Sequence, residues 1–160
     1  MEYTTKERQA LIGTCRKWTQ PLAVEKAFDH ILGSDKILDY GCGMYRTLQY
    51  KLRELGYDAH GYDLAFHDTS WGREGYYDVV IASNVLNVQP DAKRAVEVLE
   101  ELGRIAGRLI IFNYPNSPRK WKCTAKMLRV AAKISLPEWD LKHEYYGSGT
   151  LTVATRKEGS

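Results

Sequence analysis

The sequence predicts an α/β domain built as a three-layer sandwich, with a mostly parallel sheet between helices and an antiparallel last strand. Short apolar runs alternate with helical patterns from residue 36 to residue 137, which is the order of βαβ units. The run 79–82 is continuously apolar, as in strands covered on both faces. The strand patterns 139–146 and 150–155 flank Gly147-Ser148-Gly149 and predict a terminal hairpin.

The first strand and the turn after it organise the rest of the chain. An apolar run at 37–38 ends in Asp39, and Gly41-Cys42-Gly43 follows. Leucines at 48, 52 and 55 then predict a helix that ends at Gly56. A second strand, 57–62, leads into Asp63. Because such a turn points backbone N–H groups toward the carboxyl edge of the sheet, we expect a ligand site there.

The remaining segments follow in order. Thr4 or Thr5 is expected to cap a first helix with Glu7 in its first turn, and a second helix begins at Pro21. Residues 64–76 are too few for both a helix and a strand, so we expect a loop there. Later segments are a strand at 77–82, a helix from Pro90-Asp91 to Gly103, a strand at 108–112, a loop at 113–118 and a basic helix at 121–132. We expect one domain, 1–160, with N-terminal helices in 1–34 and an α/β core in 35–155.

Composition excludes several classes of protein. With 44% hydrophobic and 27% charged residues, the chain resembles a soluble globular protein. It has no apolar run of membrane-spanning length, and its N-terminus does not resemble a signal peptide. Cys15, Cys42 and Cys123 are widely spaced, which suggests reduced thiols and a cytoplasmic protein. The four histidines show no paired spacing, so we predict no metal site, and the lack of a membrane-spanning run predicts no membrane partner.

The charges are unevenly distributed. Residues 103–137 contain eight basic residues and no acidic residue, whereas the whole chain has a net charge of +3 and the remainder therefore −5. A region of one sign favours an anionic partner, with a solvated helix face as the alternative. Arg119, Lys120 and Lys122 directly follow the loop at the ligand edge, so they are the candidate substrate-binding residues.

The segment Asp39-Tyr40-Gly41-Cys42-Gly43, with Asp63 beyond it, resembles the first motif of class I S-adenosylmethionine-dependent methyltransferases. The resemblance implies a Rossmann-like methyltransferase fold with S-adenosylmethionine as cofactor. It places Asp39, Gly41 and Gly43 at the methionine part and Asp63 at the ribose. Further cofactor contacts are implied for Tyr40, Cys42, Leu64, Ser83, Asn84 and Val85. In the family's strand numbering the sheet order is 2-1-4-5-7-6, with the third strand missing or vestigial.

Two departures refine the resemblance. The family often has a third glycine where this chain has Tyr45, and a dinucleotide fingerprint would require glycine at Arg46. Arg46 therefore disfavours a nicotinamide oxidoreductase, which we keep as a distant alternative. The segments LDYGCG, GYD and SNVLNV are similar to small methyltransferases of phages and of bacterial defence systems, including those associated with DNA phosphorothioation.

Methyl transfer mainly requires alignment and desolvation. The candidates for holding an acceptor are Asn84, Asn87, Asn113 and Tyr114, and His67 is the candidate general base. Phe66, His67, Asp68 and Trp71 are candidates to flank the adenine. The alternative for the aromatic pair, Phe66 and Trp71, is that they fill the exposed edge of the sheet. An alternative function is a non-catalytic module, or partner subunit, that binds S-adenosylmethionine or a nucleotide. Neither the acceptor atom nor the oligomeric state follows from the sequence.

Changing Arg119, Lys120 and Lys122 together to Ala tests the anionic-acceptor hypothesis. We expect weaker nucleic-acid binding and a smaller salt dependence, because each phosphate contact contributes a slope of about −0.9 for duplex DNA and about −0.7 for single strands. Cofactor affinity should not change. Fluorescence anisotropy with labelled DNA and RNA measures the effect, and a wild-type protein that ignores both at low salt would assign these residues to a solvated face.

Overall fold

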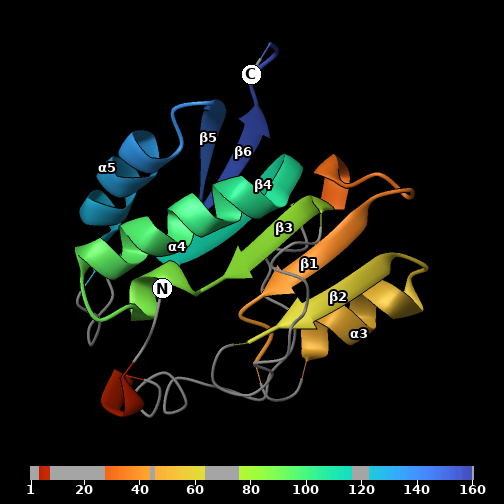
Figure 1. Ribbon diagram of the computed structural model, residues 1–160, viewed down its shortest axis with the longest axis horizontal. Helices are drawn as coiled ribbons and strands as arrows, with labels where there is room; N and C mark the ends of the chain where they lie inside the picture. Colours follow the sequence, from red (N-terminus) through yellow and green to blue (C-terminus); the bar gives the residue numbers. More distant parts are fainter. Residues whose placement is uncertain (1–3, 8–27, 44–45, 64–75, 117–122, 160) are drawn as a thin grey trace.

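The structure is a computed structural model that describes residues 4–7, 28–43, 46–63, 76–116 and 123–159. Its elements in chain order are η1 (Phe28–His30), β1 (Lys36–Tyr40), α3 (Thr47–Glu54), β2 (Asp58–Tyr62), β3 (Tyr77–Ser83), η2 (Leu86–Val88), α4 (Ala92–Ile105), β4 (Ala106–Pro115), α5 (Ala125–Ser135), β5 (Trp139–Tyr146) and β6 (Gly149–Arg156). The strands form a six-stranded sheet in the order β2-β1-β3-β4-β6-β5. Figure 1 shows α4 lying across β3 and β4.

The predicted strand order is confirmed. Strands β2, β1, β3 and β4 are parallel neighbours, and β6 and β5 pair antiparallel at the end of the sheet. Because β1 lies between β2 and β3, Asp39 is in register with Gly61 on one side and Ile81 on the other. The loop expected in place of a third strand lies outside the described residues, and within them β2 is an edge strand.

Two apolar clusters fill the layers on either side of the sheet. One packs α4 and α5 against the sheet, with Leu99, Leu102 and Phe112 fully buried. The other packs α3, through Leu48 and Leu52, against the opposite face. The sheet is therefore covered on both faces, which explains why its central strands are continuous apolar runs.

The predicted end of α4 is wrong. The helix continues through Gly103 to Ile105, and Asp91 caps its start by accepting the Arg94 N–H at 2.9 Å. Gly103 does not terminate the helix. A Cβ atom at Gly103 would lie 3.0 Å from Leu136 at the end of α5, so this glycine allows close helix packing instead.

Strand β4 is longer than predicted at both ends. It begins at Ala106, and Asn113, Tyr114 and Pro115 remain in the sheet, where they pair with Leu151, Thr150 and Gly149 of β6. The sequence predicted a loop here because asparagine and proline are turn-forming residues. The antiparallel partner supplied by the hairpin overrides that local preference, and Pro115 stands at the last position of the strand.

Leu99→Ala should lower the free energy of unfolding by about 2–5 kcal/mol, because a fully buried leucine leaves a cavity in the α4 layer. Leu55→Ala is the matched control, since Leu55 is 57% exposed and surface substitutions usually change stability by about 0.5 kcal/mol or less. Urea unfolding followed by circular dichroism measures both. Equal losses in the two variants would contradict the described packing.

Candidate functional site

The glycine turn after β1 folds back onto the end of β2. The N–H groups of Gly41 and Cys42 both donate to the Tyr62 carbonyl, at 2.7 and 2.9 Å. The Gly43 N–H donates to the Asp63 carboxylate at 2.9 Å. Gly41 and Gly43 have φ angles of 82° and 71°, the left-handed region that favours glycine. The turn is thus built from backbone groups that meet at the carboxyl ends of β1 and β2.

Gly41 also lies against the segment that follows β3. A Cβ atom at Gly41 would lie 2.5 Å from Val85 Cγ2, far closer than van der Waals contact. The absence of a side chain therefore lets the first turn and the β3 turn approach each other. The predicted cofactor residues on these two turns are brought together in space.

Two carboxylates gather at this turn. Asp39 is 3% exposed, and burial together with the nearby Asp63 charge raises the pKa of Asp39 to about 7. Within the described residues, no hydrogen-bond donor contacts the Asp39 carboxylate. A second negative charge beside a buried acid is costly, so the turn is suited to a group that carries positive charge.

Cys42 and Gln49 line the back of the turn. Burial, followed by the charges of Asp39 and Asp63, raises the pKa of the Cys42 thiol. The thiol therefore stays neutral and is not an activated nucleophile. Gln49 is buried, and its Oε1 has no hydrogen-bond partner in the part of the chain that is described.

Gln49 was missed by the sequence analysis. A Cβ atom at Gly61, on β2, would lie 2.2 Å from Gln49 Oε1 and 3.1 Å from Cys42 Sγ. The signal was Gly61 itself, because glycine inside a strand often marks a close approach of another group. The sequence could not show which residue fills that space.

Tyr40 lies on the opposite face of the sheet from Asp39. Its hydroxyl donates to the Glu101 carboxylate of α4, and its ring packs at 5.2 Å from Tyr62. The side chain of Tyr40 therefore belongs to the α4 layer, and only its main chain enters the turn.

The end of β3 is braced by Asn113. Asn84 has a left-handed φ of 54°, and its N–H donates to both the carbonyl and the side-chain oxygen of Asn113, at 3.2 and 3.0 Å. The Asn113 amide in turn donates to the Tyr146 hydroxyl at 3.2 Å. Asn113 is 1% exposed, so it holds Asn84 in place instead of pointing toward an acceptor.

The other predicted site residues either have buried polar groups in the sheet and its helix layer or lie outside the described residues. Ser83, the last residue of β3, pairs with Asn113 of β4. The Ser83 hydroxyl and the Asn87 side-chain oxygen are both buried and have no hydrogen-bond partner among the described residues. Tyr114 is fully buried under α5. Leu64, Phe66, His67, Asp68, Trp71, Arg119, Lys120 and Lys122 lie outside the described residues.

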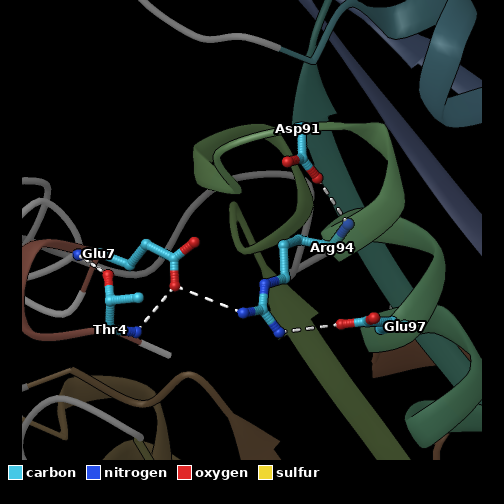
Figure 2. Close-up of polar contacts among 5 residues, drawn as sticks. All are labelled: Thr4, Glu7, Asp91, Arg94 and Glu97. Atoms are coloured by element: carbon cyan, nitrogen blue, oxygen red, sulfur yellow. Dashed lines mark hydrogen bonds and ion pairs between the residues drawn. The ribbon is translucent and has the colours of Figure 1, made fainter. Parts of the chain in front are cut away.

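The start of the chain is fixed to this edge of the molecule. Thr4 and Glu7 form the predicted capping pair, with the Glu7 N–H donating to Thr4 Oγ1 at 3.1 Å and the Thr4 N–H to Glu7 at 2.9 Å. Figure 2 shows Arg94 between Glu7 and Glu97, at 3.4 and 3.0 Å. Since α4 begins just after the β3 turn, residues 4–7 lie at the carboxyl edge of the sheet.

Several solved structures with a similar fold are methyltransferases. The magnesium protoporphyrin IX methyltransferase of Synechocystis PCC 6803, with bound SAH, has a TM-score of 0.64 at 16% identity, covering 94% of this chain and 83% of that one. A TehB-like SAM-dependent methyltransferase from Corynebacterium glutamicum has a TM-score of 0.63 at 18% sequence identity, and the match covers 95% of both chains. The methyltransferase domain of bacterial CtHen1 has a TM-score of 0.64 at 14% sequence identity, and the match covers 93% of this chain and 99% of that one.

No protein-family model and no curated protein matches the sequence. The strand order and the structural similarity nevertheless agree, and the chain has the Rossmann-like fold of class I S-adenosylmethionine-dependent methyltransferases. None of the described helices is long and apolar enough to span a membrane. Within the same residues, no group of three or more His, Cys, Asp or Glu is placed to hold a metal ion.

The buried Asp39 predicts a characteristic pH dependence of stability. The folded protein holds the Asp39 proton up to about pH 7, whereas the unfolded chain releases it near 3.8. The folded state therefore binds more protons between these values, and the free energy of unfolding should fall as pH rises from about 4 to about 7, by on the order of 4 kcal/mol in total.

Asp39→Asn removes this titration, so its stability should change less over the same pH range. Urea unfolding at a series of pH values between 4 and 8 measures the difference, with the exposed Asp140→Asn as the control. An unchanged pH profile in Asp39→Asn would contradict the assignment.

Proposed function

We propose that the protein is a methyltransferase that uses S-adenosylmethionine. The observation that carries this proposal is the pair of carboxylates, Asp39 and Asp63, at a glycine turn on the carboxyl edge of a parallel sheet. S-adenosylmethionine carries a sulfonium and an ammonium group, so its positive charges complement this site. A pyrophosphate would bring negative charge to the same place, which argues against a dinucleotide.

The residues present fit this cofactor. The buried Asp39 carboxylate lacks a donor in the described chain, and the left-handed Gly41 and Gly43 allow the close backbone approach that a ligand requires. Asp39 and the turn would hold the methionine part, and Asp63 would accept hydrogen bonds from the ribose hydroxyls. When bound, the cofactor supplies an activated methyl group. Val85 and the braced Asn84 then delimit the space on the β3 side.

We infer an anionic acceptor, with a nucleic acid as the leading candidate. The acid-free stretch 103–137 includes the end of β4 at the ligand edge, and its charges would attract phosphate groups. Among proteins of the same fold, one similar chain is part of the Pnkp1/Rnl/Hen1 RNA repair complex, with a TM-score of 0.59 at 14% identity and coverage of 87% and 43%. Asn84, in the turn after β3, stays the candidate for holding the acceptor, and His67 stays the candidate base.

A module that binds the cofactor without catalysis is the second candidate. It is favoured by the burial of Asn113 and Tyr114, two of the residues expected to hold an acceptor. Incubation with methyl-labelled S-adenosylmethionine separates the two functions, because only an enzyme transfers label to nucleic acid, protein or small-molecule pools. The narrower similarity to phage and phosphorothioation-associated enzymes, and a cytoplasmic location, remain predictions.

Asp63→Ala should weaken binding of S-adenosylhomocysteine by about 1–3 kcal/mol, the cost of losing charged hydrogen bonds to the ribose. Isothermal titration calorimetry measures the affinity, and the wild-type melting temperature should rise with the ligand. Asp140→Ala, on the exposed edge of β5, is the charge-matched control. A wild-type protein without a thermal shift at millimolar ligand would refute the proposed function.

A further inference from the structure

Polar side chains gather between α5 and the terminal hairpin. Tyr114 of β4, Thr150 of β6 and Tyr145 of β5 are directly opposite one another across three strands. The neighbouring row holds Thr152 and His143, whose Nδ1 lies 2.7 Å from the Thr152 hydroxyl. Both rows lie toward the carboxyl end of β4, on the face of the sheet opposite to the Asn113 side chain.

The Tyr114 hydroxyl is buried and makes no hydrogen bond within the described residues. The Arg129 guanidinium and the Thr152 hydroxyl are its polar neighbours, yet neither meets hydrogen-bond geometry. Burial raises the pKa of Tyr114, so its hydroxyl stays protonated as a potential donor. The Tyr114 hydroxyl is thus a buried hydrogen-bond donor whose bonding is not satisfied within the described residues.

Arg129 points toward this corner. It lies four residues after the buried Ala125 and three before the buried Ala132, so it flanks the sheet-facing side of α5 and is partly buried. No carboxylate forms an ion pair with it among the described residues, and residues 103–137 contain none. Burial and the Arg129 charge also lower the pKa of His143, so the histidine stays neutral near pH 7. A partly buried guanidinium without a counterion is an unsatisfied charge.

Tyr145 places an aromatic surface at the same location. It is 66% exposed, although its register partners Thr150 and Tyr114 are fully buried. A cation that has no carboxylate partner among the described residues, beside an exposed aromatic ring, is the combination that binds single-stranded nucleic acids, because phosphates need a positive charge and every base can stack.

We propose that Arg129 and Tyr145 form a subsite for a single-stranded segment of the acceptor, in which Arg129 binds a phosphate and Tyr145 stacks on a base. The inference rests on the proposed function and names its substrate class. The outward face of α5 is the competing surface. It carries Lys126 and Lys133, and the exposed Met127, Val130 and Ile134 lie beside them on the same helix.

The test compares Arg129→Gln and Lys126→Gln, two equal charge changes on one helix, together with Tyr145→Ala and Tyr145→Phe. Binding of fluorescein-labelled 16-nucleotide single-stranded DNA and RNA is followed by anisotropy at several salt concentrations. Arg129→Gln should reduce the salt slope by about 0.7, the value for one lost phosphate contact. Tyr145→Ala should weaken binding by about fivefold to a hundredfold, the equivalent of one stacked base, and Tyr145→Phe should retain it.

Equal effects of Arg129→Gln and Lys126→Gln would overturn the subsite, as would unchanged binding in Tyr145→Ala. S-adenosylhomocysteine affinity, measured on the same samples, separates the two proposals. Cofactor binding without oligonucleotide binding at low salt would reject the subsite and leave the proposed methyltransferase standing. Circular dichroism shows whether each variant is folded, and the comparison of Arg129→Gln with Lys126→Gln still tests the subsite if Tyr145→Ala unfolds.

Discussion

The position of two carboxylates at the adjacent ends of β1 and β2 is the constraint on which the site depends. Parallel pairing in register brings Asp39 next to Gly61, and the Gly43 N–H then reaches the Asp63 carboxylate. A buried acid beside a second acid is costly unless a positive charge compensates it. The same arrangement favours a cationic ligand, so the electrostatic cost in the free protein and the proposed recognition of S-adenosylmethionine have one cause.

Small residues let other segments approach this point. Gly41 admits Val85 from the turn after β3, and Gly61 admits the Gln49 amide and the Cys42 thiol from the α3 side. The brace from Tyr146 through Asn113 to Asn84 connects β5, β4 and β3 at the carboxyl edge. The turns after β1 and β3 are thus held by the sheet itself, which suits chemistry that depends on alignment.

The distribution of charge separates two parts of this edge. The acids Asp39 and Asp63 lie at β1 and β2, whereas Arg129 and the acid-free stretch lie at β4 and α5. A cationic cofactor and an anionic acceptor would therefore be attracted to different ends of the same edge, and the β3 turn with Asn84 stands between them.

The sequence by itself determined the strands of the sheet, the glycine turn with its two acids, and the terminal hairpin, because these depend on local periodicity and on turn residues. The strand order was implied by the resemblance to the methyltransferase family. Only the tertiary structure decided the roles of Gly103, Asn113, Tyr114 and Gln49. Gly103 looked like a helix end and Asn113-Tyr114 looked like a loop, yet packing against Leu136 and pairing with β6 placed both inside regular elements. Such long-range contacts leave no local pattern in the chain, and they turned two expected acceptor residues into a brace and a core residue.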